Sequence, residues 1–257
     1  MSRPRGSTVS EPRRIVSLAP AATVTLRELG VADRLVGVTS HCPEELADVD
    51  ADPAVLGGWL TPDLDRLETL DPDLVCTGDA LQSDLRDAIR SRGPAVHHTD
   101  ATTLDGAIEG FVELGRAVGR PDAGAALAAR SRERLARLRD RVPDERPTVY
   151  CEEWAEPPMA AGNWVPEAVA AAGGHYPFVD PGERSRAVTP ADVEAADPDH
   201  AVLHLCGRGT DVDPATITDR DWAIDPAVHV VDDALLNQPS PNLLDGIERL
   251  ADLFHER

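Results

Sequence analysis

The sequence has 257 residues, which is enough for one large domain or for two smaller lobes. It carries 46 acidic residues against 25 basic ones, all of them arginine, for a formal net charge of −21. This charge repels nucleic acid and anionic membrane surfaces, and so excludes both as partners. The acidic residues are spread along the whole chain, a pattern typical of proteins kept soluble in very high salt, and we therefore predict an acidic, halophilic protein.

Short β-rich runs alternate with helical segments in the first part of the chain. The β-rich runs occupy residues 14–20, 34–40, 73–78 and 94–99, and the helical segments occupy 24–30, 64–70 and 81–92. This alternation is typical of α/β units on a mainly parallel sheet. Residues 121–142 are rich in Ala, Arg and Leu, and predict one helix of about 20 residues and about 30 Å.

A second α/β pattern follows this helix. Its predicted strands occupy 148–153, 200–207 and 228–233, and its predicted helices occupy 166–172 and the segment from Ser240 onward. We therefore predict two Rossmann-like α/β lobes joined by a single long helix, with a ligand cleft between the lobes beyond the carboxyl ends of the strands. The predicted boundaries are 13–120 for the first lobe, 121–142 for the connecting helix and 143–257 for the second lobe.

The two halves also repeat one order of features, in the stretches 61–78 and 189–207. In each stretch Thr-Pro begins a short helix, Asp-Pro-Asp turns the chain, and a hydrophobic strand runs to a Cys. Thr61 and Thr189 are the predicted N-caps of the two helices. The repeat favours two similar lobes.

Several functional classes leave no trace in the sequence. No apolar run approaches the roughly 20 residues of a membrane span, and residues 1–14 lack the apolar core of a secretory signal. The sequence as written therefore predicts a cytoplasmic protein, whose four Cys are thiols. No nucleotide-binding loop and no nucleophile paired with a base are visible, so we expect neither a nucleotide cofactor nor an enzyme.

Three stretches of the sequence resemble a known family. They are "RIVSLAPAATVTLRELGVADRLVGVT" from residue 14, "GGWLTPDLDRLETLDPDLV" from residue 57 and "AGNWVPEAVAAAGG" from residue 161. They resemble the helical-backbone (class III) substrate-binding proteins of ABC importers, and most of all the cobalamin-binding branch, over residues 13–255. The resemblance implies a monomeric carrier that binds a corrinoid, either cobalamin or a precursor. The alternatives are haem or an iron chelate bound by the same fold, or an enzyme that acts on a corrinoid or a metal chelate.

The tryptophans are the main candidates for contact with such a ligand. Two of the four lie in the segment 151–167, which is rich in Pro, Gly and Ala and is predicted to be a loop. Rigid aromatic side chains suit a large, flat, mostly apolar corrin ring. By resemblance, Trp59 matches a family tryptophan that contacts the corrin, while Trp154 and Trp164 would face the same cleft. The alternative is that each Trp packs within its own lobe.

Three further residues are predicted to lie at the cleft, namely Cys42, His175 and Glu153. Cys and His could ligate zinc, iron or cobalt, but no CxxC or HExxH spacing appears, so no metal ligands are assigned. A Cys that is simply a small buried hydrophobic residue is the alternative. Glu153 and its neighbour Glu152 could hydrogen-bond the amide arms of a corrinoid or could be solvated acids.

The reactivity of the thiols is also predicted from their positions. Cys42 and Cys151 adjoin loops, whereas Cys76 and Cys206 are placed deeper in strands. We therefore expect the first two to react faster with a thiol reagent.

Two carboxylates correspond by resemblance to residues that dock exported relatives onto arginines of a membrane permease. Asp65 lies where the first belongs, while Ala191 occupies the second position and Asp192 is its neighbour. A cytoplasmic protein could not feed an outward-facing importer, so ligand binding is the part of the resemblance that we carry forward.

Overall fold

The computed structural model describes residues 11–42, 46–47 and 49–255 and divides the chain into two compact units. Unit 1 contains residues 11–98 and 113–124, and unit 2 contains 99–112 and 125–255. This division differs from the predicted boundaries 13–120, 121–142 and 143–257. The physical reason is that α4 (Leu104–Ala117), which we did not predict, and α5 (Pro121–Arg139) each have residues in both units.

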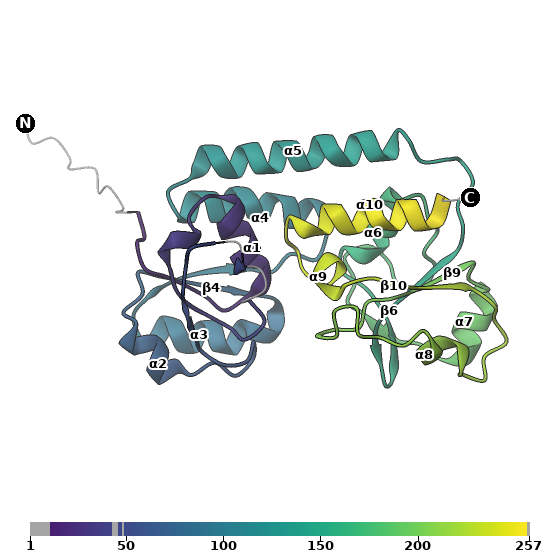
Figure 1. Ribbon diagram of the computed structural model, residues 1–257, viewed down its shortest axis with the longest axis horizontal. Helices are drawn as coiled ribbons and strands as arrows, with labels where there is room; N and C mark the ends of the chain where they lie inside the picture. Colours follow the sequence, from purple (N-terminus) through teal and green to yellow (C-terminus); the bar gives the residue numbers. More distant parts are fainter. Residues whose placement is uncertain (1–10, 43–45, 48, 256–257) are drawn as a thin grey trace, which may run out of the picture. The chain divides into compact units, whose positions relative to one another are not determined.

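Unit 1 is built on a five-stranded sheet in the order β3-β2-β1-β4-β5 (Figure 1). The strands are β1 (Ile15–Ser17), β2 (Leu35–Val38), β3 (Ala54–Val55), β4 (Leu74–Gly78) and β5 (Ala95–Thr99). The helices are α1 (Pro20–Glu28), η1 (Ala32–Arg34), α2 (Leu64–Thr69), η3 (Ala80–Gln82) and α3 (Ser83–Ser91). Strands β1 to β4 pair in parallel, as predicted. The strand order reverses between β1 and β4, where α/β folds place their ligands.

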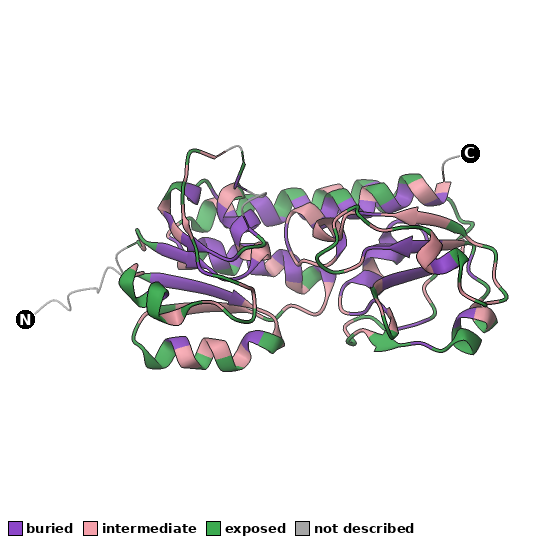
Figure 2. Ribbon diagram, turned by 60° about the horizontal axis from the view of Figure 1, so that its bottom comes forward, coloured by how far each residue is buried: buried purple, intermediate pink, exposed green. Residues whose placement is uncertain are grey.

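The core of unit 1 is formed by the buried faces of its strands and by α2 and α3. Val16 of β1 packs in one cluster with Leu67 of α2 and Ile89 of α3. The central strands β1, β2 and β4 are largely buried (Figure 2), whereas β3 and β5 have no fully buried residue. The short helices are therefore held by burial of an apolar side against the sheet, as expected for amphipathic segments of this length.

Unit 2 is built on a five-stranded sheet in the order β10-β9-β6-β7-β8. The strands are β6 (Val149–Ala155), β7 (Pro158–Ala160), β8 (Arg186–Ala187), β9 (His200–Leu203) and β10 (Ala227–Val230). The helices are α6 (Val165–Ala171), α7 (Pro190–Ala196), α8 (Ala215–Thr218), α9 (Asp233–Leu236) and α10 (Asn242–His255). Strands β6, β9 and β10 pair in parallel, whereas β7 pairs antiparallel with β6 and β8 pairs antiparallel with β7.

The segment 151–167 is therefore not one loop, as we had predicted. Its first part completes β6, turns at Glu156 and Pro157, and returns as β7 in a β-hairpin (Figure 1). Its last part begins α6. Strands of three and two residues, such as β7 and β8, are too short to show an alternating pattern, so the sequence alone did not reveal them.

The repeated Asp-Pro-Asp turns have the same structure in both units. The first aspartates, Asp71 and Asp197, both adopt a left-handed backbone with φ of 44°. The second aspartates each accept a hydrogen bond from the backbone N–H directly before the first strand of their unit, at 2.9 Å for Asp73 and 2.7 Å for Asp199. The sequence repeat therefore corresponds to a repeated structural joint.

The two predicted N-caps have different outcomes. Thr189 caps α7 and forms a capping box with Asp192, as the sequence indicated. The prediction for Thr61 is wrong, because α2 is capped by Asp63, whose carboxylate accepts the backbone N–H of Arg66 at 2.9 Å. Thr61 belongs instead to the loop that precedes α2.

The described residues include no helix that is long and apolar enough to cross a bilayer. The prediction that the N-terminus lacks a secretory signal rests partly on residues 1–10, which lie outside the described residues.

Candidate functional site

Trp59 lies beyond the carboxyl end of β3 in unit 1, on a tight loop closed by a bridge between Gly57 and Pro62. Gly57 has φ of 105°, and a Cβ there would stand 3.1 Å from the backbone oxygen of Thr61. Both conditions favour glycine, so the "GGW" sequence is what permits the turn. The turn places Trp59, which is partly exposed, at the edge where the family resemblance expects ligand contact.

Gln82 connects this loop to the middle of the sheet. Its Nε2 donates to the backbone oxygens of Leu18, at 2.9 Å, and of Trp59, at 2.7 Å. Its Oε1 accepts the backbone N–H of Gly78 at 2.8 Å. Leu18 follows β1 and Gly78 ends β4, so Gln82 lies at the point where the strand order reverses. The sequence analysis did not single out Gln82, because nothing local distinguishes it from a surface glutamine.

Exposed apolar side chains gather at this edge of unit 1. Leu60, next to Trp59, is 50% exposed, and Leu81, next to Gln82, is 63% exposed. The Gln82 side chain hydrogen-bonds the Trp59 backbone, and each leucine directly follows or precedes one of these two residues. The two leucines therefore lie on either side of this hydrogen bond. Burying such side chains against a ligand would be favourable, and their positions match an apolar binding surface.

Cys42 is buried rather than exposed at this edge. Thr23 Oγ1 donates to its sulfur at 3.2 Å, and Thr39 Oγ1 lies at the same distance from it. Cys42 therefore has the environment of a small core residue, and its contact with a ligand stays a prediction.

Trp154 is the exposed aromatic residue of the β6–β7 hairpin in unit 2. It lies near the carboxyl end of β6, not in a loop as predicted, and is 50% exposed. Its indole N–H donates to the backbone oxygen of Glu156 at 2.9 Å, which fixes the ring beside the hairpin turn. A fixed, exposed tryptophan is an apolar surface whose ordering costs little entropy on binding.

Trp164 lies elsewhere and is buried in unit 2. It directly precedes α6, and its indole N–H donates to the backbone oxygen of Leu236 at 2.7 Å. These contacts are those of a side chain packed in its own unit. The structure therefore does not bring Trp164 and Trp154 to one surface, and ligand contact by Trp164 stays a prediction.

His175 is exposed, but it lies at the amino-terminal end of β6. It forms a bridge with Thr148, and its carbonyl accepts the N–H of Val149, the first residue of the strand. Trp154 is six residues after Thr148, which corresponds to about 20 Å at the rise of a β-strand. The two predicted site residues are thus at opposite edges of the sheet.

The acidic pair Glu152–Glu153 divides between the two faces of β6. Glu153 is partly buried, and its carbonyl accepts the N–H of Cys206 at 3.0 Å. Glu152 is fully buried, so the prediction of a solvated acid is wrong for this residue. Arg220 donates to both Glu152 oxygens, at 2.6 and 2.8 Å, and the Tyr150 hydroxyl donates at 2.7 Å. Burial, followed by the charge of Glu152, raises the pKa of Tyr150, so the phenol stays protonated.

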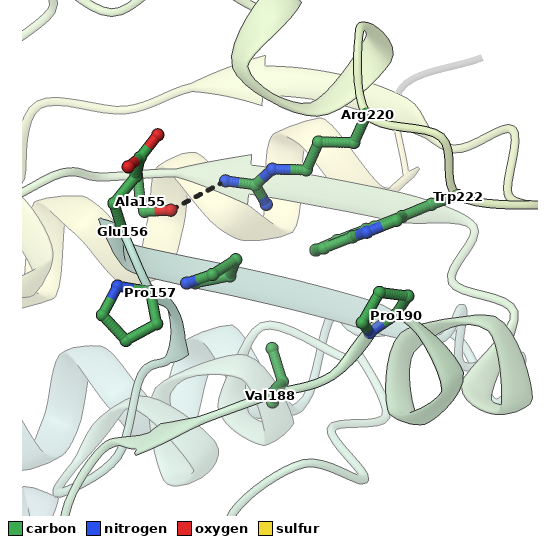
Figure 3. Close-up of a pocket in the computed structure, with 8 residues that line it drawn as sticks. Ala155, Glu156, Pro157, Val188, Pro190, Arg220 and Trp222 are labelled. Atoms are coloured by element: carbon green, nitrogen blue, oxygen red, sulfur yellow. Dashed lines mark hydrogen bonds between the residues drawn. The ribbon is translucent and has the colours of Figure 1, made fainter.

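A pocket of about 570 Å³ opens beside the hairpin turn of unit 2 (Figure 3). Its walls are residues 155–158, Val188, Pro190, Arg220 and Trp222. The Arg220 guanidinium lies 4.6 Å from the centre of the Trp222 ring and donates to the Ala155 carbonyl at 3.3 Å. Because Glu152 already neutralises Arg220, the walls combine apolar and aromatic surface with one exposed carboxylate, that of Glu156. The volume suits a small ligand or one part of a larger one.

His204 and Cys206 follow β9, at the edge of the unit 2 sheet where its parallel strands end. The Asn237 side chain hydrogen-bonds both residues. The Asn237 amide donates to the His204 carbonyl at 2.9 Å and to the Cys206 sulfur at 3.0 Å, and its oxygen accepts from His204 Nδ1. Burial lowers the pKa of His204 to about 4, so its ring is neutral. Among the described residues no cluster of three or more His, Cys, Asp or Glu is arranged to hold a metal ion.

The predicted docking carboxylates are both exposed. Asp65 Oδ1 lies 3.4 Å from Arg92 Nη1 on the surface of unit 1. Asp192 accepts from the backbone N–H and the hydroxyl of Thr189, both at 2.8 Å, and the backbone bond lowers its pKa. Asp192 therefore has a structural role as a helix cap, and docking by either residue stays a prediction.

Comparisons with known proteins agree on one family. The family model described as "Periplasmic binding protein" matches residues 15–215. A cobalamin-binding protein of Halobacterium salinarum is 31% identical over 260 residues, which cover 96% of this chain and 70% of that protein. The periplasmic vitamin B12 binding protein BtuF of Vibrio cholerae has a similar structure, with a TM-score of 0.75 at 22% identity and coverage of 96% and 99%. The periplasmic heme-binding protein RhuT of Roseiflexus sp. RS-1 has a TM-score of 0.81 at 23% identity, with coverage of 95% and 98%.

Proposed function

The chain belongs to the periplasmic binding protein family, and we propose that it binds a corrinoid, cobalamin or a precursor of it, as a carrier rather than an enzyme. The observation that carries the proposal is that each unit has exposed apolar side chains where its parallel strands end. They are Trp59, Leu60 and Leu81 in unit 1 and, separately, Trp154 in unit 2. A large, flat, mostly apolar ring would bury such side chains, which soluble proteins otherwise keep few and scattered.

The names of the relatives support this choice of ligand. The Halobacterium salinarum relative is a cobalamin-binding protein, and further relatives from Vibrio species are vitamin B12-binding proteins. These family members are binding proteins, which supports a carrier function for this chain. Location in the cell, assembly state and partner proteins stay predictions.

Haem is the second candidate ligand, because RhuT shares the fold. Haem iron needs an axial ligand such as His, Cys or Tyr. Cys42, Tyr150 and His204 are buried and offer no such ligand at the surface, whereas a corrinoid brings axial ligands with it. His41, exposed after β2, and Cys206, exposed after β9, are the residues to test if haem binds.

Titration of the protein with cyanocobalamin and, separately, with haemin decides between the ligands. In high-salt buffer we expect cyanocobalamin to quench tryptophan fluorescence in a saturable manner. Trp59→Ala and Trp154→Ala should each weaken binding by about 5- to 150-fold, which corresponds to 1 to 3 kcal/mol for one aromatic contact. Trp164→Phe tests the third predicted contact: if Trp164, which is buried, packs only within unit 2, this variant should change stability and leave the affinity unchanged.

Two results would argue against corrinoid binding. One is the absence of any cyanocobalamin binding by folded protein. The other is a Soret band that forms with haemin, with His41→Ala shifting it, since that result would favour haem. Unchanged cobalamin affinity in both Trp→Ala variants would remove the aromatic surface from the proposal.

A further inference from the structure

Gln82 holds together three separate segments at the carboxyl edge of the unit 1 sheet. Its side chain is fully buried and makes hydrogen bonds of 2.7 to 2.9 Å to Leu18, Trp59 and Gly78. These partners belong to the end of β1, the Trp59 loop and the end of β4.

The chemistry of this contact requires a glutamine. The amide offers two N–H donors to two carbonyl oxygens and one oxygen to a backbone N–H, so each polar group of the side chain is used. A glutamate in its ionised form has no donor and would face the oxygens of Leu18 and Trp59. An asparagine is one methylene shorter, and a methionine fills the space but makes no such hydrogen bond.

The bonds of the Trp59 loop to itself do not fix its position against η3. Within the loop, Asp63 N–H donates to the Leu56 oxygen at 2.6 Å and Thr61 N–H donates to the Gly58 oxygen at 3.2 Å. These bonds close the turn. The bond from Gln82 is the one that joins the turn to the segment carrying the exposed Leu81.

We propose that Gln82 is a positioning residue for ligand binding, which fixes Trp59 and Leu60 beside Leu81 as one preorganised apolar surface. The inference rests on the proposed corrinoid-binding function. A surface that is already ordered loses little conformational entropy when the ligand binds, so its loss should weaken binding although Gln82 itself is buried.

A double-mutant cycle tests whether Gln82 acts through Trp59. We expect Gln82→Met to weaken cyanocobalamin binding by about 10-fold, since the Trp59 loop loses its bond to Gln82 and must then be ordered when the ligand binds. In a Trp59→Ala background the same change should have almost no further effect, because the ring that it positions is absent. Thr77→Val is the matched control, as it removes a buried hydrogen bond to His98 of the same unit at 2.9 Å. Additive effects of Gln82→Met and Trp59→Ala would overturn the proposal.

The cyanocobalamin affinity of Gln82→Glu should depend on pH in a way that a purely structural role of Gln82 would not produce. Burial raises the pKa of an introduced carboxyl group, and its protonated form can donate one of the two lost bonds. Cyanocobalamin affinity of this variant should therefore recover as the pH falls from about 8 to about 5, relative to wild type at each pH. If Gln82→Met is too unstable to measure, this comparison within one protein carries the test. A variant affinity that follows the wild-type profile would contradict the proposal.

A ligand-independent measurement separates this inference from the proposed function. With 5-fluorotryptophan incorporated, ¹⁹F NMR reports each tryptophan, and Trp59→Phe identifies the Trp59 signal. We expect Gln82→Met, but not Thr77→Val, to shift or broaden that signal. If wild type binds no cyanocobalamin, the proposed function fails, and the same signal still shows whether Gln82 orders Trp59. An unchanged Trp59 signal in Gln82→Met would overturn the positioning role even if cobalamin binds.

Discussion

Replacing Arg220 by methionine should strongly destabilise unit 2, because it leaves a buried carboxylate without its counter-ion. Glu152 is fully buried, and Arg220 provides two hydrogen bonds of 2.6 and 2.8 Å to it. Breaking a buried pair from one side costs about 3 to 5 kcal/mol. The Tyr150 hydroxyl still donates at 2.7 Å, and the Arg220 side chain is 18% exposed, so water can partly replace it. We therefore expect a loss of about 3 kcal/mol, at the lower end of this range.

Urea unfolding at fixed high salt and neutral pH measures this loss. Arg92→Met in unit 1 is the control, because Arg92 pairs with Glu68 and Asp65 on the surface, where water screens the charges. The double variant Glu152→Gln with Arg220→Met should regain part of the stability, since no charge then remains buried. The reasoning is refuted if Arg220→Met costs less than about 1 kcal/mol, or if the double variant is less stable than the single one.

Three further predictions concern thiols, pH and salt. Cys206 should alkylate first in folded protein, since it is exposed, whereas Cys42, Cys76 and Cys151 are buried; mass-spectrometric mapping that finds Cys42 fastest would contradict this order. Because burial lowers the pKa of His204 to about 4, the unfolded chain takes up its proton at higher pH than the folded chain. Stability should therefore be complete above about pH 6.5 and fall towards pH 4, and His204→Gln should flatten this pH profile of the urea midpoint. Raising KCl from about 0.1 to about 1 M, which shortens the screening length from about 10 to about 3 Å, should raise the melting temperature, and an unchanged value would show that a net charge of −21 does not limit stability.

The regular elements were largely predictable from the sequence. Each predicted strand of unit 1 corresponds to an observed strand, because short runs of β-branched and aliphatic residues bounded by turn residues are typical of strands. The final helix, α10, was predicted from Ser240 onward because Ser-Pro is a typical helix start, and it begins at Asn242. The helix α4 was missed, since its three glycines made the segment look unlike a helix.

The roles of the tryptophans could not be separated from the sequence. Trp154 and Trp164 lie in the same short stretch, yet one is half-exposed on a hairpin and the other is buried before α6. Trp164 bonds the backbone oxygen of Leu236, 72 positions further along the chain, whereas the Trp154 indole bonds the backbone oxygen of Glu156 two positions away. Burial that depends on such a distant contact leaves no local pattern.

The polar contacts of the candidate site were equally invisible. Glu152 and Arg220 are 68 positions apart, and Gln82 reaches a loop 23 positions before it. The thiol prediction was wrong for a related reason. Cys42 adjoins a strand end, but Thr23 from α1 and Thr39 enclose its sulfur, so closeness to a loop in sequence did not mean exposure.

The repeated aspartate joints also bear on how the chain folds. Asp73 closes a loop to the start of β1 over 59 positions, and Asp199 closes one to the start of β6 over 51 positions. The entropy of closing a flexible loop grows only with the logarithm of its length, so the two closures differ by about 0.1 kcal/mol. These two closures therefore give neither sheet an entropic lead over the other.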